Sequence, residues 1–292
     1  MTKTKKSNND STILVIGGTG IIGRHIVAAS LDAGHPTLVL VRPTAASAAV
    51  DVDSDKAKLL ASLVASGATI VYGDMNDRES LVAAIRQADV VISAVGHRGT
   101  VELDGQLKVV EAIKEAGNVK RFVPSEYGCD VEQAEEGTLE PARSIIAAKV
   151  RVREAVRAAG IPYTFVCSYW AHGFMLPRLG DPLVDRPPAT VATAMEDERA
   201  ANKILYVRPP ANKLSLGQLV RLWEKKSGNT LQKRYVSDLQ LANQLAMVHS
   251  TLVAGVCEQT INPDVGAEAT ELYPEMDFLT VDSYLDALLL HA

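Results

Sequence analysis

The feature that most constrains the fold of this chain is a glycine-rich turn near its beginning. The turn follows four apolar residues, Ile13–Ile16, which predict a buried strand of a parallel sheet. Three glycines come next at the spacing G-x-x-G-x-x-G: Gly17, Gly20 and Gly23. After them, Arg24–Ala33 predicts a helix that ends at Gly34. A strand, a glycine-rich turn and a helix in this order are typical of a nucleotide-binding site.

Each glycine has its own role in such a turn. Gly17 permits the tight turn, Gly20 lets backbone approach a pyrophosphate, and Gly23 lets the helix pack closely on the strand. The N-terminus of the helix adds free N–H groups and the positive end of its dipole. We therefore expect a dinucleotide at this turn, with further contacts from Thr19, Ile21 and Ile22. A plain turn is the alternative, which the flanking strand and helix disfavour.

The end of the second predicted strand indicates which dinucleotide binds. Thr37–Val41 is apolar, and Arg42 follows where a site that prefers NAD usually carries an acidic residue. A guanidinium suits a 2′-phosphate, so the sequence predicts NADPH as the cofactor. Lys56, at the start of the next predicted helix, adds positive charge. The alternative is that Arg42 is only a solvated charge at a strand end.

Composition excludes several classes of function. The chain has 292 residues and a net charge of −5, which argues against nucleic acid as the main partner. Residues 1–11 form a polar, lysine-containing tail that we expect to be disordered and that lacks the apolar core of a secretory signal. No apolar run is long enough to span a membrane. Three scattered cysteines and six histidines without metal-ligand spacing predict reduced thiols, no metal site and a cytoplasmic location.

Apolar runs and amphipathic segments alternate along residues 12–167. The predicted strands are 13–16, 37–41, 69–72, 89–96, 120–123 and 162–166. The predicted helices are 24–33, 56–65, 77–87 (with Asp77 as N-cap), 101–116 and 142–159. Such alternation predicts an α/β fold, a Rossmann-type doubly wound parallel sheet. The fourth strand ends in small residues, Ala94, Val95 and Gly96, against which a cofactor can lie.

The alternation stops after Cys167, so residues 168–292 are predicted to form a smaller α+β substrate-binding lobe. Its expected elements are a strand at 203–207, a helix opened by Ser215 with an apolar face, and helices near 237–249 and 281–290. Three aromatic residues follow the last strand of the first domain: Tyr169, Trp170 and Phe174. They either form core beneath the lobe or line a pocket for an aromatic substrate.

The Tyr-x-x-x-Lys pair of short-chain dehydrogenases is missing. Lys149 is preceded at that spacing by Ile145. By sequence alone, a lysine on a helix is most simply a solvated charge. Any acid–base role of Lys149 would therefore have to be performed without that tyrosine, and its small or apolar neighbours and the position of its helix after the fifth strand are compatible with such a role.

Several segments together resemble the plant isoflavone reductase-like branch of the NmrA-like, atypical short-chain dehydrogenases. The matching segments are Gly17–Gly23, Gly73–Asp77, Asp89–Ser93, Arg121–Gly128, Gly160–Thr164, Leu205–Pro210, Leu222–Lys226 and Glu271–Pro274. That branch includes phenylcoumaran benzylic ether, pinoresinol–lariciresinol, isoflavone and leucoanthocyanidin reductases. The resemblance covers nearly the whole chain, from about Thr12 to Leu289.

The resemblance implies an NADPH-dependent reductase of phenylpropanoid-derived substrates, with Lys149 as catalytic lysine and nicotinamide neighbour. In its ether-reductase members, the lysine would remove a phenolic proton, the benzylic C–O bond would open, and hydride would reach the benzylic carbon. Pro124, Ser125 and Tyr127 would then shape the nicotinamide site. The substrate residues would be Tyr127, Tyr169, Trp170 and Phe174. A packed ring or a turn hydroxyl is the alternative role for Tyr127 and Ser125.

The substrate stays open at this point. Compared with the family pattern, the chain is short near Thr190–Met195 and Gln244–Leu245, on the substrate side. A leucoanthocyanidin, isoflavone or lignan reductase of the same family is one alternative to an ether reductase. A non-catalytic NADP(H)-binding redox sensor is another, favoured by these short segments and disfavoured by Lys149 and the aromatic residues. The expected partner is a small aromatic substrate, and a homodimer is left open.

Overall fold

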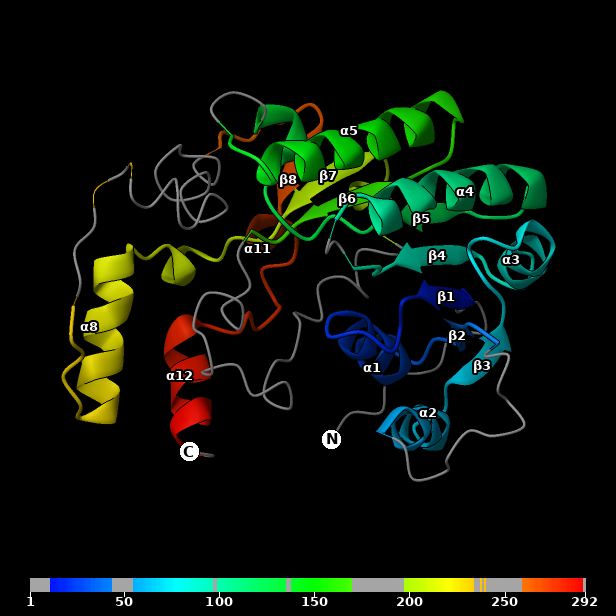
Figure 1. Cartoon of the computed structure of the whole chain (residues 1–292). Coiled ribbons are helices and arrows are strands. Elements are labelled where there is room, and N and C mark those ends of the chain that lie inside the picture. The colour runs from blue at the N-terminus through cyan, green and yellow to red at the C-terminus, as the bar shows by residue number, and fades with distance from the viewer. Residues whose placement is uncertain are drawn as a thin grey trace. The chain divides into compact units, whose positions relative to one another are not determined.

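A five-stranded parallel sheet in the order β3-β2-β1-β4-β5 is the centre of the first part of the molecule (Figure 1). The computed structural model describes residues 11–43, 55–96, 99–134, 138–169, 197–233, 237, 239 and 259–290. The strands are β1 (Ile13–Ile16), β2 (Thr37–Val41), β3 (Thr69–Tyr72), β4 (Val90–Ser93) and β5 (Arg121–Val123). This confirms the predicted α/β class with a doubly wound parallel sheet.

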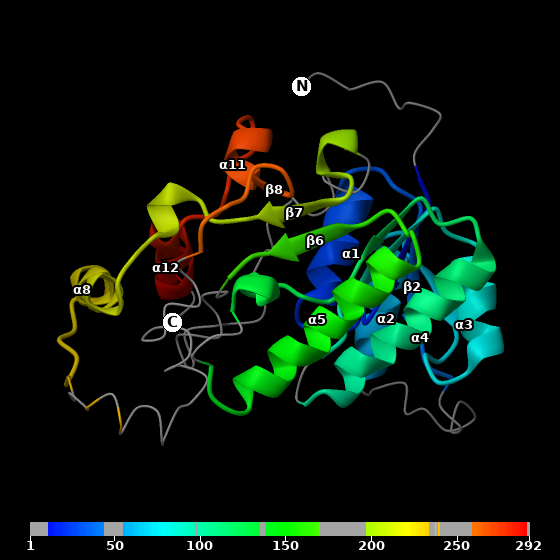
Figure 2. The ribbon, with the colours of Figure 1, turned by 90° about the horizontal axis from the view of Figure 1, so that it is seen from above.

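The helices between the strands lie on both faces of the sheet. They are α1 (Gly23–Asp32), α2 (Asp55–Ala65), α3 (Arg78–Ile85), α4 (Val101–Ala116) and α5 (Ala142–Ala158). Figures 1 and 2 show α1 and α2 on one face of the sheet and α3 and α4 on the other. The chain therefore reverses direction along the sheet between β1 and β4. In open α/β sheets, ligands bind at the carboxyl ends of the strands at this reversal point.

Local chemistry sets the ends of these helices as the sequence predicts. The side chain of Asp77 caps α3 by accepting a hydrogen bond from the N–H of Glu79. Gly117 ends α4 in the left-handed conformation at φ 71°, which glycine adopts without strain. On α5, Ile146, Val152 and Val156 are buried.

The sixth predicted strand differs from expectation. Strand β6 (Thr164–Cys167) belongs to a three-stranded sheet in the order β6-β7-β8 and not to the five-stranded sheet. Between β5 and this segment, the described residues form a single parallel bridge, Phe122 to Tyr163. We attribute the short contact to Pro124, which follows β5 directly and has no N–H to continue a ladder.

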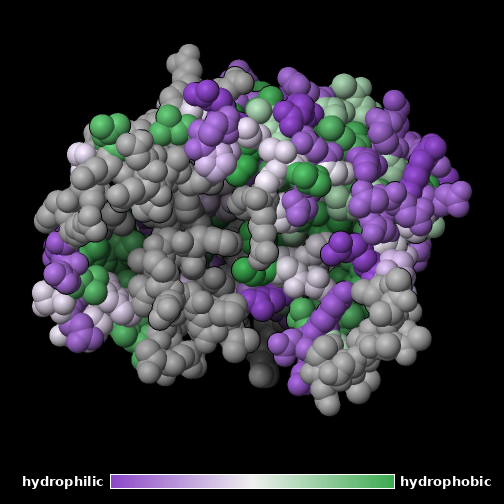
Figure 3. Space-filling view, in the orientation of Figure 1, coloured by the Kyte–Doolittle hydropathy of each residue, from purple (hydrophilic) through white to green (hydrophobic). Residues whose placement is uncertain are grey.

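The central strands of the five-stranded sheet are buried from solvent. Every residue of β1, β2 and β4 is buried, as expected for strands covered on both faces by helices. At the edge, β3 is more open, and its Tyr72 is 65% exposed. Hydrophilic side chains gather around α3 in Figure 3, where Arg78, Glu79 and Arg86 are exposed.

One hydrogen-bond pair joins the start of β1 to the start of β4. The Asp89 carboxylate accepts the N–H of Thr12 (2.9 Å), and the Asp89 N–H donates to the Thr12 carbonyl (2.8 Å). The hydrogen bond from Thr12, and then Lys120, hold the pKa of Asp89 below its ordinary value. A lowered pKa in the folded state stabilises the protein above the unfolded pKa, and this contribution is lost as pH falls through the folded pKa.

We therefore expect Asp89→Asn to lower the free energy of unfolding by about 1 kcal/mol at pH 7, a modest value because the side chain is about one-third exposed. The difference between wild type and variant should shrink once pH falls below about 4. Urea denaturation at several pH values measures both quantities. Equal stability of the two proteins at pH 7 would contradict this role of Asp89.

By their packing, the described residues divide into two compact units with interleaved segments. The first unit falls within Met1–Glu126, Ala148–Phe165 and Val191–Lys203, and the second within Tyr127–Ala147, Val166–Thr190 and Ile204–Ala292. A division at Cys167, with a nucleotide domain before it and a substrate lobe after it, stays a prediction. The chain passes between the two units more than once.

The second unit contains β7 (Lys203–Tyr206) and β8 (Gly266–Glu268), which pair in parallel. Its helices are α8 (Leu216–Ser227), α11 (Ala269–Leu272) and α12 (Val281–Leu290). Short 3-10 turns lie at Val131–Gln133 and Pro210–Asn212 in this unit, and at Glu198–Ala200 in the first.

As predicted, Ser215 opens α8, and its side chain forms a reciprocal capping box with Gln218. The apolar face of α8 packs on α12. The members of this cluster are Leu219, Leu222, Trp223, Val281, Tyr284 and Leu285. The N-terminal tail, the segment around Thr190–Met195 and nearly all of the predicted helix at 237–249 lie outside the described residues. Within the described part of the chain, no helix is long and apolar enough to cross a membrane.

Candidate active site

The glycine-rich turn after β1 is as tight as its spacing predicts. Gly17 has φ +81°, and a Cβ there would lie 2.6 Å from the Ala94 carbonyl oxygen at the end of β4. A Cβ on Gly23 would lie 2.0 Å from the Gly17 carbonyl oxygen. Both positions therefore require glycine, because each added carbon would meet backbone that cannot move aside alone. Gly17 brings β1 and β4 together, and Gly23 brings α1 against the turn.

The turn presents backbone donors in the way that a phosphate group requires. The Gly20 N–H closes the turn onto the Gly17 carbonyl (2.9 Å), and the Arg24 N–H begins α1 on the Gly20 carbonyl (3.1 Å). The N–H groups of Thr19, Ile21 and Ile22 make no hydrogen bond to another described residue. Donors at a helix N-terminus bind anions well. These residues fit the pyrophosphate of a dinucleotide.

The predicted residues of the 2′-phosphate site lie on the surface. Arg42 follows β2, which is paired with β1, and its side chain is exposed. Lys56 is exposed in the first turn of α2. An exposed guanidinium at this strand end can receive a phosphate without the cost of removing a buried charge from water. Whether Arg42 and Lys56 bind one phosphate stays a prediction.

On the other side of the turn, the ends of β4 and β5 are tied together. Ser125 follows Pro124 after β5, and its hydroxyl donates to the Val95 carbonyl (2.9 Å). The Ser125 N–H donates to the side-chain oxygen of Gln106 (2.7 Å). At Gly96 an added Cβ would meet no atom within 4 Å, so the end of β4 borders open space. The structure thus brings Val95 and Ser125 together as a nicotinamide site requires, although their contact with a cofactor stays a prediction.

Gln106 is a residue that sequence reasoning missed. It lies in the middle of α4 and is fully buried, and its side-chain nitrogen has no hydrogen-bond partner among the residues that the structure describes. Buried donors are nearly always paired, so this nitrogen fits a site that a ligand or a water molecule completes. A signal was present in the sequence, because Gln106 is polar on the same helical face as the apolar Leu103 and Val110.

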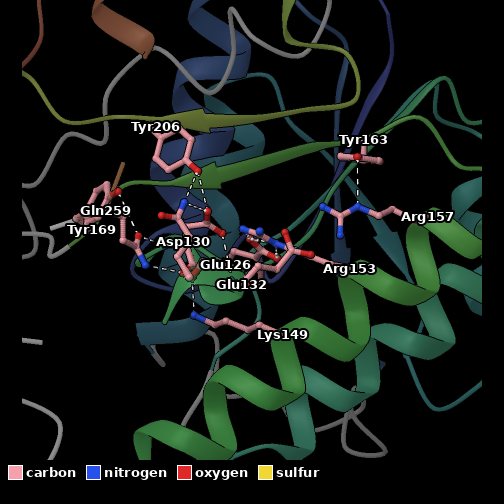
Figure 4. Close-up of polar contacts among 12 residues, drawn as sticks. Glu126, Asp130, Glu132, Lys149, Arg153, Arg157, Tyr163, Tyr169, Tyr206 and Gln259 are labelled. Carbon is pink, nitrogen blue, oxygen red and sulfur yellow. Dashed lines mark hydrogen bonds and ion pairs between the residues drawn. The ribbon is translucent and has the colours of Figure 1, made fainter. Parts of the chain in front are cut away.

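Lys149 lies on the buried face of α5 and is only 7% exposed. Its ammonium group donates to the backbone carbonyl of Glu126, with 2.7 Å between Nζ and oxygen. The Glu126 carboxylate pairs with Arg153, one turn further along α5 (Figure 4). The solvated-charge interpretation of Lys149 is therefore wrong. Sequence reasoning assigned no role to Glu126 or Arg153. The available signal is the position of Arg153, four residues after Lys149 and between the apolar residues Val152 and Val156.

Two of the predicted substrate residues belong to the second unit and share an unusual backbone. Tyr127 has φ +37° and Tyr169 has φ +55°, a region that side chains other than glycine rarely adopt. The Tyr169 N–H donates to the Gly128 carbonyl (3.0 Å), so the two segments are joined. Strained residues are frequent at functional sites, where the surrounding structure holds them. Trp170 and Phe174 lie outside the described residues.

A buried polar network holds Tyr169 in place. Its hydroxyl contacts the Gln259 side-chain oxygen (3.3 Å), and that oxygen also accepts the N–H of Asp130 (2.8 Å). The Gln259 side-chain nitrogen donates to the Asp130 carbonyl (2.7 Å), and the Tyr206 hydroxyl donates to the Asp130 carboxylate (2.7 Å). Burial and then this hydrogen bond raise the pKa of Tyr206, which keeps the phenol neutral. Sequence reasoning missed this network, because Gln259 is 129 positions from Asp130.

Comparison with known proteins places this geometry among reductases. The model of the NmrA-like family matches residues 9–187 and 188–285. The chain is 44% identical to an isoflavone reductase homolog from Zea mays, covering 97% of this chain and all of the relative. It is also 44% identical to eugenol synthase 1 from Petunia hybrida, covering 94% and 97%. Its identity to phenylcoumaran benzylic ether reductase Pyrc5 from Pyrus communis is again 44%, covering 94% and 98%.

Solved structures give the same result. A structure of AtPrR2 with NADP+ and (+)-pinoresinol is 34% identical with a TM-score of 0.83, covering 97% of this chain and all of the other. The binary complex of leucoanthocyanidin reductase with NADPH from Vitis vinifera is 30% identical with a TM-score of 0.81, covering 96% and 99%. Both were solved with the nicotinamide cofactor that Arg42 predicts.

Proposed function

Because the chain belongs to the NmrA-like family and to its isoflavone reductase-like branch, we propose that it transfers hydride to a benzylic carbon of a phenylpropanoid-derived substrate with opening of an ether. It is an NADPH-dependent reductase. The observation that carries the proposal is the buried Lys149 ammonium, held on the Glu126 carbonyl. Glu126 directly follows Ser125, whose hydroxyl donates a hydrogen bond to the Val95 carbonyl at the end of β4.

The candidate site residues of the first unit each have a defined role in this proposal. The backbone around Gly17–Gly23 would hold the pyrophosphate, and Arg42 with Lys56 the 2′-phosphate. Val95 and Ser125 would border the nicotinamide. Bound NADPH would supply the hydride. Lys149, in its neutral amine form, would take the phenolic proton of the substrate, and electron density from the phenolate would open the benzylic C–O bond. The hydride would then reach the benzylic carbon, and the two phenolate oxygens would take up protons from Lys149 and from solvent.

Burial gives Lys149 two properties that this role needs. Its charge is only slightly solvated, so transfer of a proton to or from Nζ needs little rearrangement of water. Its ammonium group donates to the neutral backbone carbonyl of Glu126, which fixes the direction of the side chain, while the Glu126 carboxylate is paired with Arg153.

NADPH oxidation with a phenylcoumaran-type dimer, followed by identification of the product, tests the proposal. We expect the ring-opened product, with one NADPH consumed for each ether reduced. The three relatives at 44% identity do not separate an ether reductase from a eugenol synthase, so eugenol formation is the second candidate activity. Lignan, isoflavone and leucoanthocyanidin substrates complete the panel. NADPH binding without turnover of any of them would overturn the proposal in favour of a cofactor-binding redox sensor.

Cofactor preference provides a separate prediction for Arg42. Because its guanidinium is expected to bind the 2′-phosphate, Arg42→Ala should raise the Kd for NADPH about tenfold, the loss of one exposed charge-assisted contact. The Kd for NADH, which has no 2′-phosphate, should stay the same. Fluorescence titration with both cofactors measures the two constants. Equal weakening of both would show that Arg42 acts on the fold and not on the phosphate.

The remaining predictions on the protein's surroundings rest on the sequence. A small aromatic substrate fits the names of the relatives, and Tyr127 and Tyr169 are its proposed contacts. A cytoplasmic location and a homodimer stay predictions.

A further inference from the structure

The Glu126–Arg153 pair in the first unit is a fully buried ion pair joined by several hydrogen bonds. The two side chains are 1% and 0% exposed. Arg153 Nε lies 2.9 Å and 3.0 Å from the two carboxylate oxygens of Glu126, and Nη2 lies 2.7 Å from Oε2. The guanidinium also covers the Phe165 ring, with 4.7 Å from Cζ to the ring centre. Both the position and the direction of the Glu126 side chain are therefore fixed.

Glu126 is held by two cations of the same helix face. Its carboxylate forms an ion pair with Arg153, and its backbone carbonyl accepts a hydrogen bond from the Lys149 ammonium, with 2.7 Å between Nζ and oxygen. Lys149 and Arg153 are four positions apart on α5, so they lie one above the other on one side of the helix. Figure 4 shows the two side chains reaching from α5 to the Glu126 segment. The ion pair with Arg153 and the hydrogen bond from Lys149 thus share Glu126. The ion pair fixes the position of the carbonyl that accepts the Lys149 hydrogen bond.

We propose that Glu126 and Arg153 are positioning residues, which hold the Glu126 carbonyl so that it directs the Lys149 ammonium. This inference rests on the proposed role of Lys149 as the proton-transfer group. Neither residue contacts the reacting atoms in this proposal. Their effect passes through peptide 126, whose neighbour Ser125 is fixed on its own side by Gln106 and Val95.

Stability alone is a weak explanation for this pair. Taking two charges out of water costs about as much as their attraction returns, and buried ion pairs can often be replaced by apolar residues without loss of stability. What such a pair does well is to fix one geometry, because the planar guanidinium binds the carboxylate through more than one donor. A fixed geometry is of use where a catalytic group must be held within a fraction of an ångström.

The double variant Glu126→Gln with Arg153→Met tests the proposal, since it removes both charges of the pair together. We expect the protein to fold, and the Kd for NADPH and the KM for substrate to stay within about twofold of wild type. The kcat should fall about tenfold to hundredfold, as expected for a misplaced catalytic group. Arg153→Lys, which keeps a cation beside Glu126 but loses the planar donors, should recover part of kcat.

A second measurement does not depend on the substrate. Acylation of the folded protein with an amine-reactive reagent, followed by peptide mass spectrometry, gives the labelling rate of Lys149. That rate should rise at least tenfold in the double variant, because the ammonium loses its fixed acceptor. Leu81→Ala in α3 is the matched control: it removes a buried side chain away from Lys149 and should lower Tm without changing kcat or Lys149 labelling.

The two measurements separate the possible failures. A folded double variant with wild-type kcat and wild-type labelling would overturn the positioning role. Equal acceleration of labelling in Leu81→Ala would overturn it as well, because loss of stability would then explain the effect. If wild type turns over none of the substrates, the proposed reaction fails, and the labelling rates still decide whether Glu126 and Arg153 hold Lys149.

Discussion

Replacing Lys149 by methionine is expected to lower kcat about 10²–10⁴-fold, the usual contribution of general acid–base catalysis. Methionine keeps an unbranched apolar stem of similar length, so α5 should remain packed, and it removes the ammonium group that donates to the Glu126 carbonyl. The loss should appear in kcat and kcat/KM together, because the proton transfer occurs only in the transition state. The Kd for NADPH should change less than tenfold.

Steady-state kinetics with the substrate of the wild-type enzyme, together with NADPH titration, measures these effects. Lys108→Met on α4 is a suitable control, because Lys108 is an exposed lysine whose ammonium contacts Asn76 on the surface. That variant should keep the wild-type kcat. A Lys149→Met protein that binds NADPH and turns over at the wild-type rate would show that another group moves the proton.

The sequence predicts most of the first unit because its signals are local. An N-cap such as Asp77, a left-handed glycine such as Gly117 and short apolar runs each depend on a few neighbouring residues. The sixth strand shows the limit of this reasoning. Its own residues favour a strand, and it forms one, but its sheet partner depends on where β5 ends at Pro124. Which distant strand a segment pairs with is not encoded in any local periodicity of the sequence.

The candidate site divides in the same way. The spacing of Gly17, Gly20 and Gly23 reflects contacts within one turn, so the sequence alone predicts them, and the geometry of the turn agrees. The role of Lys149 is implied by the family resemblance, since its small or apolar neighbours alone do not distinguish it from a solvated lysine. Gln106 and Arg153 were missed, because each acts on a partner 19 and 27 positions away along the chain. Only the folded structure brings such partners together.

Among the glycines whose surroundings the structure describes, Gly23 is the one where an added methyl group is expected to have the largest effect. A Cβ there would lie 2.0 Å from the Gly17 carbonyl oxygen, 2.7 Å from its carbon and 2.8 Å from the Gly18 Cα. All three atoms belong to backbone, so no side chain can turn away to make room. Either α1 moves away from β1 or the turn opens. We expect a destabilisation of about 1–3 kcal/mol or somewhat more, as for other overpacked sites.

Cofactor binding should suffer beyond this loss of stability, because the turn and the N-terminus of α1 hold the phosphates together. The Kd for NADPH should therefore rise at least tenfold in the fraction of Gly23→Ala that is folded, as measured by titration well below its Tm. Gly217→Ala is the control, since an added Cβ in the first turn of α8 would meet only the Arg221 guanidinium, at 3.5 Å. Alanine is the better helix former, so Gly217→Ala should be neutral or stabilising by up to about 1 kcal/mol. If Gly23→Ala instead binds NADPH like wild type, the close contact between α1 and the turn is not what shapes the phosphate site, and the donors would have to come from elsewhere in the chain.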